Sequence, residues 1–318
     1  MIRSMLKWPG GKSRVIPELL PHLPKADCLV EPFVGGASVF LNTDYRRYIL
    51  ADINPDLIRL YREAKNNPDL LISITRLLFE KGNCKEEYLR NRKLFNSADS
   101  KILASVRRAA LFLYLNRHGY NGVVRYNQKG NYNIPFGKHK SNPYFPEKEI
   151  RCFAEKANDT KALFLCCSFH NTIEIITGAD AVIYCDPPYL PASETANFTQ
   201  YHTEPFTERH HRQLATELLA VNRKHGTPIV ISNSDTEITR EIYHDFRLHE
   251  ISVQRSVSTD ASNRQKAKEI IGVLNICEGC GRAGGGCCPD CGPAARLRKR
   301  HCRTGRGSVH NGISGNAR

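Results

Sequence analysis

A short apolar run that two prolines stop abruptly lies in the second half of the chain. Residues 182–185 are four strand-forming residues, and Asp186-Pro187-Pro188-Tyr189 follow them directly. Because prolines cannot donate a hydrogen bond to a sheet, we expect a buried strand that ends at Cys185. In an open α/β sheet, ligands bind at the carboxyl ends of the strands. The pattern therefore predicts a carboxylate, a rigid carbonyl and an aromatic ring at a pocket mouth; the alternative is a strand that simply ends in a proline turn.

Similar short runs recur along the chain and alternate with helical patterns, which predicts a mostly parallel sheet in an α/β protein. The stretch from residue 55 to about 116 is helical and amphipathic, and we interpret it as an insertion on the sheet domain. The predicted strands are 28–30, 48–50, 162–167, 181–185 and 228–232, with 270–274 as a final edge strand. The other predicted helices are 13–20, 173–176, 208–224 and 236–245.

The first predicted strand leads into a glycine turn, because residues 31–36 read Glu-Pro-Phe-Val-Gly-Gly. Adjacent glycines let the backbone approach a ligand closely, and the helix that follows offers free N–H groups. The sequence does not match the G-x-G-x-x-G pattern of dinucleotide-binding proteins, and it does not match a P-loop. Asp52 ends the next strand, 17 residues after Gly35, where an acidic residue commonly binds ribose hydroxyls. A second, compatible role for Asp52 is the N-cap of the helix that begins near Pro55.

The N-terminal segment carries the only tryptophan of the chain. Residues 7–12 read Lys-Trp-Pro-Gly-Gly-Lys, a composition typical of a tight loop with an accessible backbone. Trp8 is a candidate wall for a flat ligand, and the two lysines are candidate partners for anionic groups. The alternative is a tryptophan–proline contact that only fastens the N-terminus.

Residues 117–140 are rich in Asn, Gly, Tyr, Arg and Lys and contain no acidic residue. Turn signals at 121–122 and 129–131 favour a hairpin here. Basic side chains between aromatics and amides suit nucleic acid, because the charges meet phosphates while amides and arginines read base edges. The formal net charge of +14 favours the same polyanionic partner. The alternative is a solvated basic hairpin.

The chain shows no signal peptide and no apolar run long enough for a membrane span, so we expect a cytoplasmic protein without a membrane partner. Six of the twelve cysteines are scattered over residues 1–276 and are interpreted as small buried hydrophobes. The other six lie in the tail, where Cys277, Cys280, Cys288 and Cys291 form two C-x-x-C units. These units suit either a zinc site or a loose extension with free thiols. Beyond Pro293 the composition is that of a basic flexible arm.

Five motifs in this order resemble the Dam-type DNA adenine-N6 methyltransferases of class alpha. They are Lys-Trp-Pro-Gly-Gly-Lys, Glu-Pro-Phe-Val-Gly-Gly, Ala-Asp-Ile-Asn, Tyr-Asn-Gly-Val-Val-Arg-Tyr-Asn and Tyr-Cys-Asp-Pro-Pro-Tyr, and the resemblance runs from about Leu6 to Leu274. It implies a Rossmann-like sheet that uses S-adenosylmethionine, with a helical and hairpin insertion for DNA recognition. The substrate would be adenine N6 in double-stranded DNA, within GATC, and no metal is required. The resemblance leaves open a role in a restriction system, a prophage, or mismatch repair and replication.

The resemblance divides the chain into a catalytic domain (1–55 and 155–276), a target-recognition insertion (56–154) and a flexible tail (277–318). It assigns cofactor contacts to Trp8, Lys12, Phe33, Gly35, Gly36, Asp52 and Asp186. It assigns DNA contacts to Lys7, Tyr120, Asn121, Val123, Arg125, Pro135 and Lys138, with Tyr120 inserted beside a flipped base. Val123 stands where a leucine is usual, and Lys138 where an arginine is usual. A lysine cannot form the bidentate contact of an arginine.

The chemistry of adenine N6 suggests roles for the four residues at 186–189. The N6 lone pair is delocalised into the ring, so the amino group is a poor nucleophile. Asp186 and the carbonyl of Pro187 are expected to accept one N6 hydrogen bond each, while Pro188 stiffens the turn and Tyr189 stacks on the base. The base must leave the duplex to reach them. We expect a monomeric enzyme; the alternative function is methylation of an exocyclic amine in RNA.

Overall fold

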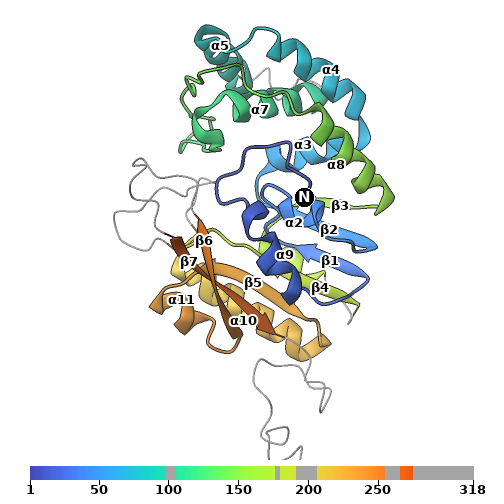
Figure 1. Ribbon diagram of the computed structural model, residues 1–318, viewed down its shortest axis with the longest axis vertical. Helices are drawn as coiled ribbons and strands as arrows, with labels where there is room; N and C mark the ends of the chain where they lie inside the picture. Colours follow the sequence, from blue (N-terminus) through green and yellow to red (C-terminus); the bar gives the residue numbers. More distant parts are fainter. Residues whose placement is uncertain (98–104, 176–179, 191–205, 255–265, 275–318) are drawn as a thin grey trace, which may run out of the picture.

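A computed structural model describes residues 1–97, 105–175, 180–190, 206–254 and 266–274. Within them, a seven-stranded sheet forms the centre of the molecule, in the order β3-β2-β1-β4-β5-β7-β6 (Figure 1). The first five strands run parallel, whereas β7 is antiparallel to both β5 and β6. The strands are β1 (Cys28–Glu31), β2 (Arg47–Asp52), β3 (Leu163–Cys166), β4 (Ala181–Cys185), β5 (Ile229–Ser234), β6 (Arg247–Gln254) and β7 (Lys266–Leu274). The predicted α/β class and its parallel strands are confirmed.

Helices cover the sheet and extend beyond it on one side. Figure 1 shows α4, α5 and α7 together at the top of the molecule, and α10 and α11 at the opposite side of the sheet. The helices are α1 (Ile16–Leu19), α2 (Ser38–Leu41), α3 (Pro55–Asn66), α4 (Pro68–Phe79), α5 (Lys85–Asn96), α7 (Ser105–His118), α8 (Glu147–Asp159), α9 (Phe169–Glu174), α10 (Glu208–His225) and α11 (Glu237–Ile242). Short 3-10 helices are η1 (Lys12–Arg14), η2 (Leu20–His22) and η3 (Tyr120–Gly122).

Successive residues of the central strands point to opposite faces of the sheet, and both faces are buried. Leu29 and Val182 belong to a large apolar core that also contains residues of α3, α7 and α8. Val30 and Ile183 belong to a second core, together with residues of α10 and α11. A strand that is buried on both faces is apolar throughout, as parallel strands commonly are. This explains why the continuous runs at 28–30 and 182–185 marked the sheet so clearly.

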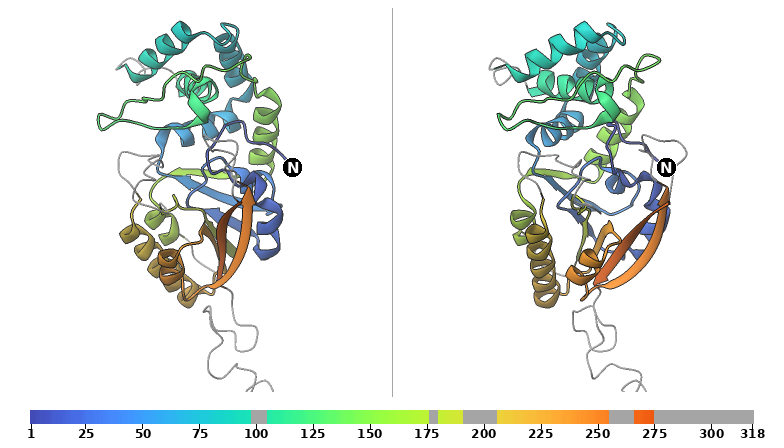
Figure 2. Two further views of the ribbon diagram at one scale, coloured as in Figure 1. Left: turned by 60° about the vertical axis from the view of Figure 1, so that its left-hand side comes forward. Right: turned by 90° about the vertical axis from the view of Figure 1, so that its left-hand side faces the viewer.

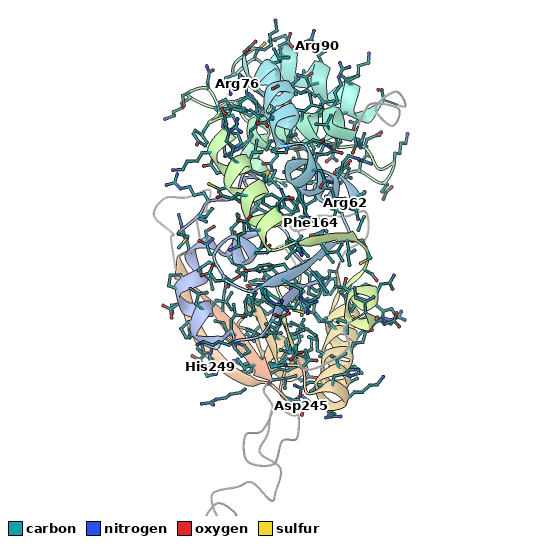
Figure 3. All side chains as sticks on the ribbon, turned by 90° about the vertical axis from the view of Figure 1, so that its right-hand side faces the viewer. Arg62, Arg76, Arg90, Phe164, Asp245 and His249 are labelled. Carbon is teal, nitrogen blue, oxygen red and sulfur yellow. The ribbon has the colours of Figure 1, made fainter. Side chains whose placement is uncertain are left out.

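The connection from β2 to α3 is made by Asn54. Its side chain accepts hydrogen bonds from the backbone N–H groups of Asp56 and Leu57, and Pro55 occupies the first turn of the helix. The N-cap role considered for Asp52 is therefore wrong, because Asn54 lies at the capping position. At its far end α3 is tied back to the sheet, since Arg62 donates two hydrogen bonds to the carbonyl of Phe164 in β3 (Figure 3).

Two predictions about the sheet need correction. The run 270–274 is not an edge strand, because β7 lies between β5 and β6. The edge is β6, which the sequence analysis missed. Its residues are mostly polar, and Ile251 is the buried apolar one among those whose burial is described. An edge strand with one solvated face lacks the continuous apolar signal of the central strands.

The segment after α7 runs out and back, as the hairpin prediction requires, but it forms no regular pair of strands. It has two isolated antiparallel bridges, Gly119 with Phe136 and Tyr126 with Tyr132. A few backbone hydrogen bonds join its two arms, and Asn96 of α5 adds two side-chain hydrogen bonds to the backbone of Tyr132. Figure 2 shows this loop, in green, projecting from the helices.

The cysteine prediction holds in part. Cys28 and Cys185 are buried in the sheet, whereas Cys166 is exposed and the remaining described cysteines are half-buried. The two C-x-x-C units and the basic arm lie outside the described residues. Among the described residues, no helix has both the length and the apolar character that crossing a membrane requires.

Candidate functional site

Three acidic residues lie at the carboxyl ends of neighbouring parallel strands. Glu31 ends β1, Asp52 ends β2, and Asp186 follows β4 directly. The strand register places Val30 beside both Ile49 and Ile183, so the three strands end close to one another. The prediction that the Asp-Pro-Pro-Tyr segment follows a buried strand at a ligand-binding edge agrees with this topology.

The Asp186 carboxylate is held by a cluster that also contains Lys12, Tyr189 and Glu269. Lys12 Nζ lies 3.0 Å from Asp186 Oδ1 and 3.5 Å from Glu269 Oε2. It also contacts the Tyr189 hydroxyl and lies 4.4 Å from the centre of the Tyr189 ring. The side chain of Lys12 is 6% exposed and that of Asp186 21%, so the carboxylate reaches solvent while its partner does not.

Asp186 Oδ1 has a second donor, Ser232 of β5, whose hydroxyl lies at 3.0 Å and also contacts the Tyr184 hydroxyl at 2.8 Å. Lys12 and Ser232 therefore both contact Oδ1 of Asp186. Among the described residues Oδ2 has no hydrogen-bond partner, so it can accept a further hydrogen bond. Sequence reasoning missed Ser232, because a serine inside a buried strand is not by itself a signal.

Burial and charge act in opposite directions in this cluster. Burial raises the pKa of Asp186 above its ordinary value, and the Lys12 ammonium opposes that rise. Burial also acts to lower the pKa of Lys12, but Asp186, Tyr184 and Glu269 together raise it, so Lys12 stays protonated. Burial and the neighbouring Asp186 raise the pKa of Glu31 to about 8, which keeps this carboxyl neutral at pH 7.

A buried histidine supports the proline turn from the other side. Nε2 of His211, in α10, lies 3.0 Å from the Pro188 carbonyl, and its Nδ1 lies 2.8 Å from the Tyr243 hydroxyl. Burial lowers the pKa of His211 to about 4, so the ring is neutral. Because a neutral imidazole carries one N–H, Nε2 donates to the Pro188 carbonyl and Nδ1 accepts from the Tyr243 hydroxyl. The sequence marked α10 as a helix but carried no sign of this contact.

The glycine turn and Trp8 fit closely together. A Cβ at Gly35 would lie 2.9 Å from Trp8 Nε1, and a Cβ at Gly36 would lie 2.9 Å from Trp8 Cβ. Only glycines let the indole lie this close. Asp52 lies beside the turn and accepts hydrogen bonds from the N–H groups of Gly35 (3.2 Å) and Asn54 (2.9 Å). These two bonds hold the Asp52 carboxylate against the glycine turn.

Phe33, the cofactor candidate that precedes the two glycines, contacts other aromatic rings. Its ring stacks on Phe169 at 5.7 Å and meets Phe206 edge-on at 5.6 Å, so it joins an aromatic cluster of the second core. Of the other cofactor candidates, Trp8 lies against Gly35 and Gly36, Asp52 lies beside Gly35, and Lys12 pairs with Asp186. A turn without side chains, a carboxylate beside it and a buried cation are compatible with an S-adenosylmethionine site.

The N-terminal loop and the loop after α7 lie side by side. Asn116 is fully buried, and its amide donates to the carbonyls of Lys7 and Gly122 (both 2.8 Å) and accepts from the N–H of Lys7 at 2.9 Å. Gly122 has φ +68°, and a Cβ there would lie 2.2 Å from the Cβ of Lys7. Asn116 and Gly122 therefore join two segments that the sequence analysis treated separately.

The predicted DNA contacts lie on this joined surface. Tyr120, Asn121, Arg125, Pro135 and Lys138 are exposed, whereas Lys7 and Val123 are half-buried. The outgoing and returning arms of the loop meet where the N–H of Tyr120 donates to the carbonyl of Pro135 at 3.0 Å. Near its tip the loop is anchored on Asp56, which is buried and accepts from Tyr126 (2.9 Å) and, outside the loop, from Arg108 (2.7 and 3.1 Å).

A parallel sheet with a glycine turn after β1, an acid after β2 and Asp-Pro-Pro-Tyr after β4 defines a Rossmann-like methyltransferase that uses S-adenosylmethionine. The family model of D12 class N6 adenine-specific DNA methyltransferases matches residues 8–257. The chain belongs to this family. It transfers a methyl group to adenine N6 in DNA, which removes the support for the alternative of an RNA substrate.

Curated relatives agree with this assignment. The chain is 48% identical to the DNA adenine methylase of Escherichia coli strain K12 over 272 residues, which are 85% of this chain and 95% of that one. It is 48% identical to the enzyme of Salmonella typhi over 274 residues, with the same coverage. The Vibrio cholerae enzyme is 45% identical over 273 residues, covering 86% of this chain and 96% of the other.

Proposed function

We propose that the enzyme methylates the adenine of GATC sites in double-stranded DNA. The observation that carries this proposal is the joined surface of the N-terminal loop and the loop after α7. It presents the aromatic, amide and basic side chains that the family resemblance assigns to GATC reading, with five of the seven exposed. The net charge of +14 supports attraction to a polyanion. The monomeric state and the cytoplasmic location stay predictions.

We infer that Asp186 and the Pro187 carbonyl accept the two N6 hydrogen bonds of the target adenine. Oδ1 of Asp186 is held by Lys12 and Ser232, so the carboxylate is oriented before the base arrives. Preorganised acceptors of this kind need no rearrangement during the reaction. S-adenosylmethionine supplies the activated methyl group. As the amino group gives up its delocalised lone pair and becomes positive, the carboxylate stabilises it.

The target base must leave the duplex, and Tyr120 is our candidate for filling the gap. Tyr120 is 50% exposed, which leaves a large aromatic ring accessible on the surface of the protein. Extrusion of a base costs a few kcal/mol, which an inserted aromatic ring offsets in part. Tyr189 would then stack on the extruded base beside Asp186.

Catalysis and DNA recognition are assigned to different parts of the chain. We propose that residues 1–55 and 155–276 carry out methyl transfer and that 56–154 recognise the target. In support, Asp186, Lys12 and Glu269 cluster at the sheet, whereas the exposed reading residues lie on the loop that α5 and α7 hold.

The test is to incubate the protein with an unmethylated plasmid and S-adenosylmethionine and to map the methylated adenines. We expect methylation at GATC and at no other tetranucleotide. Asp186→Asn should lower kcat by a hundredfold or more, roughly the effect of removing one preorganised active-site group, with duplex binding retained. Asp69→Asn, at an exposed ion pair with Arg151, is the matched control and should behave as wild type. Methylation outside GATC would refute the sequence specificity, and an active Asp186→Asn would refute the role of Asp186.

A further inference from the structure

We propose that Glu269 sets the net charge of the active site and positions Tyr189 and Lys12 for the reaction. Neither the sequence motifs nor the family resemblance assigns this residue a role. Glu269 lies in β7, opposite Ser234 of β5, on the antiparallel side of the sheet. The inference rests on the proposed assignment of Asp186 and Tyr189 to the reaction.

The contacts of Glu269 point into the site. Its Oε2 accepts a hydrogen bond from the Tyr189 hydroxyl at 2.8 Å and lies 3.5 Å from Lys12 Nζ. The residue is 8% exposed, so these contacts are shielded from water. A buried hydroxyl that donates to a carboxylate is held more firmly than one that donates to solvent. Tyr189 can therefore present its ring to the target base in one fixed orientation.

The charges of the described cluster do not cancel. Lys12 is the cation, and Asp186 and Glu269 are the two carboxylates. Among the described residues, no second Lys, Arg or His lies within ion-pair distance of either carboxylate. Buried carboxylates without matching cations are costly. Counted over the described residues, the cluster has one negative charge in excess and is complementary to one more cation.

S-adenosylmethionine carries that cation as a sulfonium, whereas the product S-adenosylhomocysteine has a neutral thioether. As the bond from N6 to the methyl carbon forms, the bond from sulfur to that carbon breaks and its electron pair makes the sulfur neutral. The positive charge passes to N6, which releases a proton to solvent and leaves the adenine neutral. An excess negative charge near the cofactor site therefore favours the methyl donor over the spent product. Glu269 supplies one of the two carboxylates that produce the excess.

Two variants separate the effect of the negative charge of Glu269 from its effect on the position of Tyr189. Glu269→Gln keeps an oxygen that can accept from Tyr189 but removes the charge, so it should bind S-adenosylmethionine about tenfold more weakly and S-adenosylhomocysteine nearly as well as before. Glu269→Asp keeps the charge but withdraws the carboxylate from Tyr189. It should retain the wild-type ratio of the two affinities while kcat falls about tenfold and the KM for DNA changes little.

The affinities can be measured without DNA or turnover, because Trp8, the only tryptophan, lies on the glycine turn and reports on ligand by its fluorescence. The matched control is Glu250→Gln on β6, whose carboxylate is 64% exposed and pairs with Arg240. An unchanged affinity ratio in Glu269→Gln would overturn the charge role, and wild-type kcat in Glu269→Asp would overturn the positioning role. If Glu269→Gln does not fold, Glu269→Asp still decides the positioning role. Failure of the GATC proposal would appear in the plasmid map and leave these titrations unaffected.

Discussion

Replacement of Gly122 by alanine tests whether the N-terminal loop and the DNA-reading loop act as one surface. Gly122 has φ +68°, and an added Cβ would lie 2.2 Å from Lys7 Cβ and 3.0 Å from the Lys7 carbonyl oxygen. Because Cβ is the root of the Lys7 side chain, it cannot turn aside as a flexible tip would. One of the two backbones has to move.

The cost of this substitution has two parts. An L-residue in the left-handed region costs about 1–2 kcal/mol. Overpacking of a filled site costs roughly 1–3 kcal/mol more. The free energy of unfolding of Gly122→Ala should therefore fall by about 2–5 kcal/mol. The movement should also break the hydrogen bonds by which Asn116 joins Lys7 to Gly122.

Gly130→Ala is the matched control, because Gly130 has φ +74° in the same loop but nothing within 4 Å of an added Cβ. It should lose only the backbone contribution, about 1–2 kcal/mol. Urea unfolding measures the stabilities, and fluorescence anisotropy with a labelled GATC duplex measures the affinities. We expect Gly122→Ala to bind the duplex at least tenfold more weakly than Gly130→Ala. Equal losses in the two variants would refute the reasoning, since the contact with Lys7 would then contribute nothing.

Two further predictions concern specificity and pH. Arg125→Ala should weaken discrimination against sites with one wrong base by about 10–100-fold, as the loss of a base-reading arginine does, whereas Lys129→Ala should weaken binding to all duplexes alike; an unchanged methylation map would remove Arg125 from the reading surface. His211, whose pKa burial lowers to about 4, resists protonation in the folded state. The unfolded chain takes up that proton near pH 6.5, so stability should decline as pH falls from about 6.5 towards 4, by at most about 1.4 kcal/mol per pH unit from this residue. Urea unfolding between pH 7 and pH 5 should show a shallower decline in His211→Gln; the same slope in both proteins would count against a buried neutral histidine.

Much of the site could be predicted because it depends on short stretches of chain. The Asp-Pro-Pro-Tyr turn, the glycine turn and Asp52 each follow directly after an apolar strand, and parallel strands bring their carboxyl ends together. A local pattern and the topology are then enough to place these groups at one edge. Phe33 shows the limit of this reasoning: no local pattern indicated that its ring contacts Phe169 and Phe206, which are far from it along the chain.

The amino-acid sequence by itself determined the α/β class, the positions of the central strands along the chain and the turn that carries Asp186. These features follow from continuous apolar runs and from prolines and glycines, whose effects on the backbone are local. Only the tertiary structure decided which side chains support the turn: Ser232 from β5, His211 from α10 and Glu269 from β7. Each reaches Asp186, Pro188 or Tyr189 through a single hydrogen bond formed across a large separation along the chain. Such contacts leave no periodic pattern, because a buried polar residue is placed by the partner that satisfies it, and that partner is known only once the chain has folded.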